Sequence, residues 1–217
     1  MANYFNLTLD TLAPSISSFT INNGQSITTL RSVSLAIASS DSDVAAMKIW
    51  GYEGHLTEAS ASWETFAATK TVSLPSADGQ YTLHVKIRDD VYNESAEATA
   101  TITLSTELPE ITITGPDVSK ISEITGKNVA TFSFTVDVNI KAYKVKVVPT
   151  QNTAHDGGTQ IGTTGGSVNM TGGAVNANTA VTCKINGSDF KSAIEGVDGT
   201  YIIKVFAQSA TNDLWSA

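Results

Sequence analysis

The stretch DGQYTLHVKIRDD, residues 78–90, decides the fold class of this chain. Tyr, Leu, Val and Ile at positions 81, 83, 85 and 87 alternate with Thr, His, Lys and Arg at positions 82, 84, 86 and 88. This period of two predicts a β-strand with one buried face and one polar face. A similar stretch, DGTYIIKVFAQSA, occupies residues 198–210. The recurrence predicts a duplicated β domain.

The duplication extends upstream of this strand. Pro14 and Pro109 head similar segments 95 residues apart, and SVSLAIASSDSDVAAMKIW at 32–50 matches ATFSFTVDVNIKAYKVKVV at 130–148. The strands at 78 and 198 are 120 residues apart, so the second copy holds an insertion of roughly 25 residues. Residues 151–178, rich in Gly, Thr and Asn, supply it as an expected long loop or loosely held hairpin. The expected organisation is an N-terminal strand or arm at 1–12, domain 1 at 13–107 and domain 2 at 108–217.

Composition agrees with an all-β protein of two tandem immunoglobulin-like β-sandwich domains. The 217 residues are 41% hydrophobic and 16% charged, and roughly a quarter of them are Ser or Thr. A formal charge of -8 disfavours nucleic acid as a partner. No run of 18 apolar residues indicates a membrane span, and no export signal is recognisable at the start. The lone Cys183 cannot form a disulfide within the chain, and we expect it buried and reduced.

The sequence is similar to the bacterial and phage immunoglobulin-like repeat. The residues that carry the resemblance are DTLAPSISSFTINNG (10–24), VSLAIASSDSDVAAMKIW (33–50), ASWETFAATKTVSL (61–74) and DGQYTLHVKIRDDVYNES (78–95). Copy two matches more loosely. The resemblance implies an immunoglobulin-like fold and two settings: virion proteins of tailed bacteriophages, or large secreted bacterial surface proteins and polysaccharidases. A fold of this kind specifies function weakly.

The N-terminal end of the chain resembles the last strand of a repeat copy. Residues 7–11 align with residues 102–106, the last strand of copy one, whereas copy two ends at Ala217 without such a strand. One hypothesis is that residues about 3–11 complete copy two, in another molecule or in the same chain, because an incomplete sandwich exposes unpaired backbone groups. The alternative is that these residues form an outer edge strand of copy one and that copy two has only six strands. The candidate strand-donation residues are Tyr4, Phe5, Leu7, Leu9 and Trp215.

Carboxylates gather in loops that the fold could bring to one end of a sandwich. Oxygen-rich loop clusters can bind Ca²⁺, although the spacing matches no EF-hand, and the alternative is a set of solvated turn residues. The weak Ca²⁺ candidates are Asp41, Asp43, Asp89, Asp90 and Glu94.

Aromatic residues surround one loop of copy one. If exposed, Trp50, Tyr52 and His55 could contact a glycan or a protein partner, whereas Trp63 and Phe66 are expected in the core. The three His residues have no Ser, Cys or Asp in a recognisable catalytic motif, so we expect no enzyme, no catalytic residue and no cofactor.

The expected function is that of a non-enzymatic bacteriophage virion protein. An auxiliary protein that decorates the capsid exterior is favoured, made in the host bacterial cytoplasm and bound to the major capsid protein or other virion proteins. The alternatives are a tail or fibre component, or a module that binds carbohydrates or mediates host adhesion. Self-association through the N-terminal strand and contact with surface glycans are further expectations.

Overall fold

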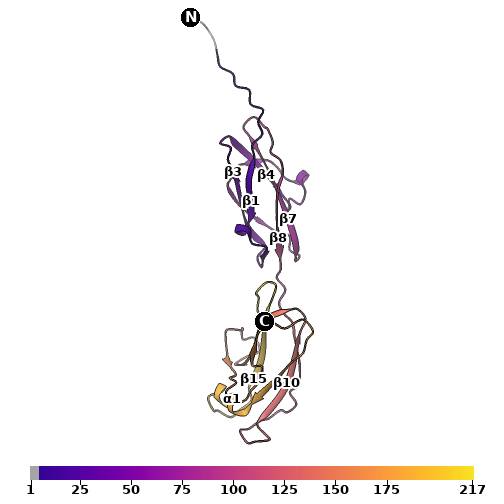
Figure 1. Cartoon of the computed structure of the whole chain (residues 1–217), viewed down its shortest axis with the longest axis vertical. Coiled ribbons are helices and arrows are strands. Elements are labelled where there is room, and N and C mark those ends of the chain that lie inside the picture. Colours follow the sequence, from indigo (N-terminus) through magenta and orange to yellow (C-terminus); the bar gives the residue numbers. More distant parts are fainter. Residues whose placement is uncertain (1–4) are drawn as a thin grey trace. The chain divides into compact units, whose positions relative to one another are not determined.

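The computed structural model describes residues 5–217 and divides the chain into two compact units, residues 1–106 and 107–217 (Figure 1). The division lies one residue from the boundary expected from the repeat. Each unit has a hydrophobic core of its own.

Unit 1 is a sandwich of two sheets. One sheet has the order β1–β3–β6, and the other has the order β2–β8–β7–β4–β5. All neighbouring pairs are antiparallel except β2 and β8. The strand bounds are β1 Ile16–Ile21, β2 Ile27–Thr28, β3 Ser32–Ser39, β4 Val44–Trp50, β5 Glu64–Thr65, β6 Thr69–Ser73, β7 Gly79–Asp89 and β8 Ala98–Leu104. Two short 3₁₀ turns, Asn22–Gly24 and Glu58–Ser60, lie outside the sheets.

The period-two residues of these strands form the core of unit 1. In β7, Leu83, Val85 and Ile87 have no exposed surface, and the intervening His84, Lys86 and Arg88 face outward. The core residues of β3, β4 and β8 follow the same alternation. The predicted all-β, immunoglobulin-like fold is therefore what unit 1 adopts.

Unit 2 also consists of two sheets, and it contains a short helix that unit 1 lacks. Its sheets have the orders β14–β10–β9 and β12–β11–β13, and β15 also pairs with β11. The bounds are β9 Ile111–Thr114, β10 Val129–Val136, β11 Ile140–Val148, β12 Thr159–Gln160, β13 Thr171–Gly172, β14 Val181–Asn186 and β15 Ile202–Ser209. A seven-residue helix, α1 (Gly187–Ala193), follows β14. The side chain of Asn186 caps it by accepting the N–H of Ser188. No helix within residues 5–217 has the length and hydrophobicity to cross a membrane.

Most of the insertion at 151–178 lies outside strands, as expected of a long loop, but two short strands and two buried side chains attach it to the sandwich. Its strands β12 and β13 both pair with β11. The reason is a pair of apolar anchors, Ile161 and Met170, which are 1% and 0% exposed in the core of unit 2. The side-chain amide of Gln160 fixes the two arms by donating to the carbonyl oxygens of Val145, at 2.8 Å, and of Met170, at 2.9 Å.

Candidate functional site

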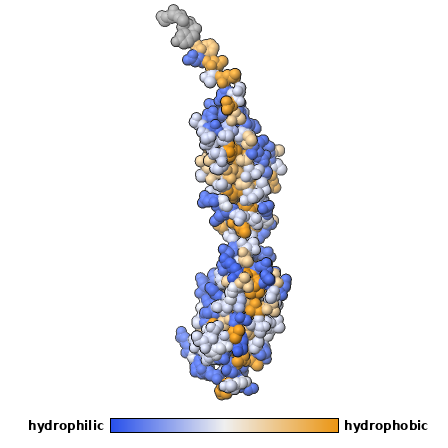
Figure 2. Space-filling view, in the orientation of Figure 1, coloured by the Kyte–Doolittle hydropathy of each residue, from blue (hydrophilic) through white to orange (hydrophobic). Residues whose placement is uncertain are grey.

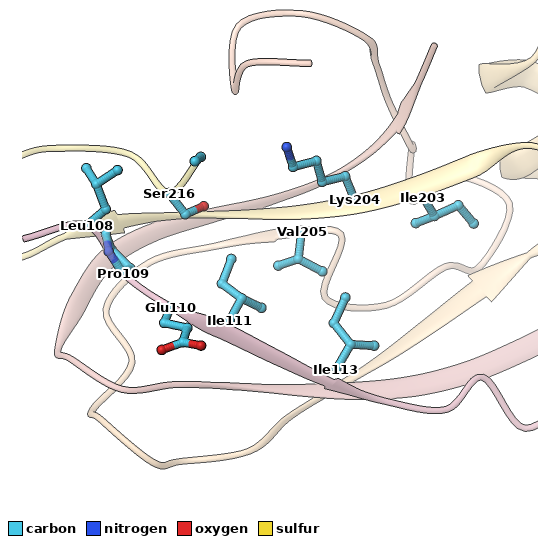
Figure 3. Close-up of a pocket in the computed structure, with 10 residues that line it drawn as sticks. Leu108, Pro109, Glu110, Ile111, Ile113, Ile203, Lys204, Val205 and Ser216 are labelled. Carbon is cyan, nitrogen blue, oxygen red and sulfur yellow. The ribbon is translucent and has the colours of Figure 1, made fainter. Parts of the chain in front are cut away.

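An apolar groove lies on unit 2 between β9 and β15 (Figure 3). It has a volume of about 460 Å³. The residues preceding and forming β9 make one wall, and β15 with the last two residues makes the other. The lining residues are Leu108, Pro109, Glu110, Ile111, Ile113, Ile203, Lys204, Val205, Ser216 and Ala217.

The same place in unit 1 is filled by β8. Ile102 and Leu104 of β8 are each 1% exposed, and β8 pairs with β7 from Gly79 to Val85. The corresponding part of β15 in unit 2 pairs only with β11 among residues 5–217. The backbone edge of β15 is therefore open along this groove.

The exposure of matching side chains also differs between the units, as expected if one position is filled and the other open. Leu83 in β7 has no exposed surface, whereas Ile203, 120 residues later, is only partly buried. Ile113 on the opposite wall is 47% exposed. Apolar side chains that converge beside an open strand edge form the kind of surface that accepts an added β-strand.

The described part of the arm, residues 5–12, lies in no strand, and its large apolar side chains are exposed. Phe5, Leu7, Leu9 and Leu12 are 84%, 87%, 87% and 80% exposed. Figure 2 shows several orange, hydrophobic groups of atoms along this segment. The alternative of an outer edge strand is wrong for residues 5–11, because they belong to no strand. The physical reason is that β8 of unit 1 already occupies the position that the arm resembles.

Two of the candidate strand-donation residues need separate comment. Tyr4 lies outside the described residues. Trp215 does not line the groove, because its ring stacks on His155 at 4.8 Å, with the Lys144 ammonium 4.6 Å from the ring centre. It is held on the outer face of its own unit, whereas Ser216 and Ala217 reach the groove.

Carboxylates do converge at the arm end of unit 1, but in a different set from the one expected. Oxygens of Asp10, Asp43 and Asp89 lie within 4.8 Å of one another. Asp10 was not predicted, because it belongs to the arm. Asp41 is not in this cluster: its carboxylate accepts the N–H of Ser15 at 2.7 Å and the Ser15 hydroxyl at 3.0 Å, which lower its pKa.

Most of the predicted acidic residues have structural roles or lie apart from this cluster. Asp90 and Glu94 are exposed and do not join it. Buried Asp89 accepts the N–H groups of Val91 and Asn93 and the side-chain amide of Asn93. Burial acts to raise the pKa of Asp89, but these hydrogen bonds outweigh it and the pKa is lowered. Its oxygens therefore already hold the turn after β7, which leaves them little capacity for a cation.

The aromatic residues of unit 1 are largely engaged with one another and with cations. Trp50 is 6% exposed and stacks on His84 at a centroid distance of 5.1 Å, so the expectation that it could contact a glycan is wrong. The long side chains of β7 cover it: the Lys86 ammonium lies 5.9 Å from its ring. Tyr52 and His55 are partly buried and pack against each other at 4.9 Å.

Arg88, which lies opposite Ala46 in the β4–β7 pair, contacts two aromatic rings. The Arg88 guanidinium lies 4.5 Å from the Trp63 ring centre and 4.4 Å from that of Tyr92. Trp63 therefore packs on the outer face of the sheet rather than in the core, whereas Phe66 packs against the core as expected. Cation–π contacts of this kind stabilise the face on which they lie.

Comparisons with known proteins find similarity only to solved structures, at low sequence identity. No family model matches it, and no curated protein matches its sequence. A Bacillus thuringiensis chitinase, ChiA74, is 16% identical with a TM-score of 0.35, over 92% of this chain and 30% of the chitinase chain, so this chain spans under a third of that protein. The fibronectin(III)-like modules of Clostridium thermocellum CbhA are 15% identical with a TM-score of 0.43, over 92% of this chain and 90% of theirs. The D00–D0 domain of intimin is 12% identical with a TM-score of 0.36, over 92% of this chain and 97% of that one. The strand orders of the two units themselves assign the chain to the all-β class, with two immunoglobulin-like sandwiches.

Proposed function

We propose that this chain is a non-enzymatic structural subunit that joins a larger assembly by accepting a β-strand in the groove of unit 2. The observation that supports the proposal is the open edge of β15 beside the apolar side chains of β9. Strand addition supplies main-chain hydrogen bonds for affinity, while alternate side chains enter the groove and give specificity.

We further propose that the assembly is the virion of a tailed bacteriophage, with the chain as an auxiliary protein on the capsid exterior. Support comes from the repeat motif of residues 10–95. The contrasting role, adhesion to glycans, loses its strongest stacking residue because Trp50 is buried under His84 and Lys86. Of the predicted contact residues, Tyr52 and His55 would then have to bind the glycan.

Particles purified from the producing host test this proposal. We expect the chain to sediment with the particles and to occupy symmetric positions in electron-microscopy maps. We also expect Ile113→Arg, which places a charge on the groove wall, to reduce the bound copies at least tenfold, whereas Thr112→Arg on the same strand should not. The chain remaining entirely in the supernatant contradicts the virion role. Glycan-array binding that Tyr52→Ala abolishes would replace it with the adhesion role.

A further inference from the structure

We propose that Trp63, Arg88 and Tyr92 form a binding site for a sugar acid, a saccharide that carries a carboxylate on its ring. The site lies on the outer face of the unit 1 sheet that contains β4 and β7. It does not depend on the groove of unit 2. The Arg88 guanidinium binds the carboxylate, and the two aromatic side chains contact the sugar ring and its hydroxyl groups.

The Arg88 guanidinium has no hydrogen-bond acceptor in the described part of the chain, and its Nε atom is buried. The other arginine of the chain is fully engaged: Arg31 donates from Nε to the Leu74 carbonyl oxygen at 2.9 Å and from Nη2 to the Glu53 carboxylate at 2.6 Å. Glu94 lies opposite Arg88 in a backbone bridge, but the two side chains form no ion pair. A guanidinium matches a carboxylate through two parallel N–H donors, so an unpaired one that is partly buried indicates an anion from outside the chain.

Two aromatic rings give Arg88 a nonpolar surrounding. The guanidinium carbon lies 4.5 Å from the centre of the Trp63 ring and 4.4 Å from that of Tyr92. Rings at this distance displace water from the guanidinium. A lower local dielectric strengthens the attraction between the guanidinium and any carboxylate that reaches it.

The backbone of Tyr92 adopts a conformation that few residues with a side chain accept. Its φ is 71°, in the left-handed region that favours glycine. Tyr92 is 69% exposed, so burial in a core does not offset this unfavourable conformation. A large ring that is held beside a cation, exposed and on a strained backbone, indicates a role in binding rather than in folding.

The polar groups of the two rings favour a sugar acid over an acidic peptide. The indole N–H of Trp63 and the hydroxyl of Tyr92 form no hydrogen bond with any of residues 5–217. Both can therefore bond to the hydroxyl groups of a saccharide, and the exposed Tyr92 ring can pack on the C–H groups of a sugar ring. A peptide carboxylate would pair with Arg88 and leave both polar groups unused.

Titration of the full chain with acidic oligosaccharides tests the proposal. The probes are oligosaccharides of glucuronate, galacturonate and sialic acid, and binding is followed by NMR through the indole N–H signal of Trp63. We expect at least one of them to shift this signal. Its carboxyl-reduced form, which keeps the ring and the hydroxyl groups, should not. Failure of all three to bind, or equal binding of the acidic and the reduced form, overturns the proposal.

A conservative substitution tests the role of Arg88. Arg88→Lys keeps the charge but loses the paired donors, so it should weaken binding by about tenfold or more. Arg31→Lys is the matched control, because Arg31 already pairs with Glu53, and it should bind as the wild type does. Unchanged binding by Arg88→Lys contradicts the proposal.

Replacing Tyr92 with glycine separates binding from folding. Glycine accepts a φ of 71°, so Tyr92→Gly should not lower the Tm of unit 1, whereas the affinity for the bound oligosaccharide should fall by about tenfold or more. A lower Tm with unchanged affinity would assign the ring to stability alone and refute its role in the site.

A tetraglutamate peptide tests the class of ligand. We expect it to bind more weakly than the oligosaccharide by about tenfold or more, because it offers the carboxylate without the sugar ring and hydroxyl groups. Equal affinity for the peptide would overturn the assignment to a sugar acid. Particle binding that persists in Arg88→Lys would leave the proposed structural role standing, since that role depends on unit 2.

Discussion

Replacing Asp189 with Asn should release the insertion of unit 2 from its anchor. The Asp189 side chain is 4% exposed, and its two oxygens accept the N–H of Gly165 at 2.6 Å and of Ser167 at 2.8 Å. Burial acts to raise the pKa of Asp189, but these hydrogen bonds outweigh it, so the pKa is lowered and the group is charged at neutral pH.

The size of the expected loss of stability follows from the hydrogen bonds that Asn cannot accept. Its amide keeps one acceptor and turns the other oxygen into an NH₂ group that faces a backbone N–H. A hydrogen bond to a charged acceptor contributes about 1.5–3 kcal/mol. Losing one such bond and making the other neutral should lower the free energy of unfolding of unit 2 by about 2–4 kcal/mol. In a domain of this size that corresponds to a fall in Tm of roughly 8 °C or more.

Calorimetry and amide exchange measure this effect directly. The amides of Gly165 and Ser167 should exchange faster in Asp189→Asn, while the melting of unit 1 should not change. Asp198→Asn is the matched control, because Asp198 is an exposed carboxylate in the same unit. Because the pKa of Asp189 is lowered in the folded state, the greater stability of wild type over Asp189→Asn is fully present above the unfolded pKa, about 4. This stability difference shrinks as the pH falls through the folded pKa. Equal shifts in Tm for the two variants would refute the reasoning.

Three further predictions concern the two cores. Cys183 is fully buried and burial raises its pKa to about 11, so a thiol reagent at pH 8 should label it only after unfolding; rapid labelling of the native chain would contradict this. Gly51→Ala should destabilise unit 1 by more than about 2 kcal/mol, because φ is 94° and the new Cβ would lie 2.2 Å from the Thr82 carbonyl oxygen; Gly24→Ala, with φ of 85° but open space around it, isolates the clash by calorimetry. Phe134→Ala should cost about 3–5 kcal/mol in unit 2 and leave the unit 1 transition in place, since Phe134 is 1% exposed in the core of unit 2; a shift in both transitions would show that the units do not melt separately.

The strands could be predicted because a strand that is buried on one face has apolar residues at every second position of its sequence. Leu83, Val85 and Ile87 are buried as that pattern requires. The insertion at 151–178 could not be predicted in the same way. Its order depends on two isolated apolar residues, Ile161 and Met170, and on hydrogen bonds from Gln160 and to Asp189, none of which makes a periodic pattern.

The candidate sites were predicted unevenly, for reasons that are also physical. Trp50 shares the outward face of β4 with Lys48, so alternation excludes it from the core, but only the structure places the side chains of β7 over it. The groove could be anticipated from the repeat, whereas its exposed wall could not. One signal was present: Ile113 stands where the first copy has Ser18, an apolar residue in place of a polar one.

The open edge of β15 also determines how ionic strength should act on this protein. Every copy carries a formal charge of -8, so copies repel one another at low salt. The groove and the apolar face of the arm offer mainly nonpolar contacts and backbone hydrogen bonds, which salt does not screen. Added salt should therefore not weaken the binding of an apolar strand in the groove, the opposite of its effect on a complex held by ion pairs.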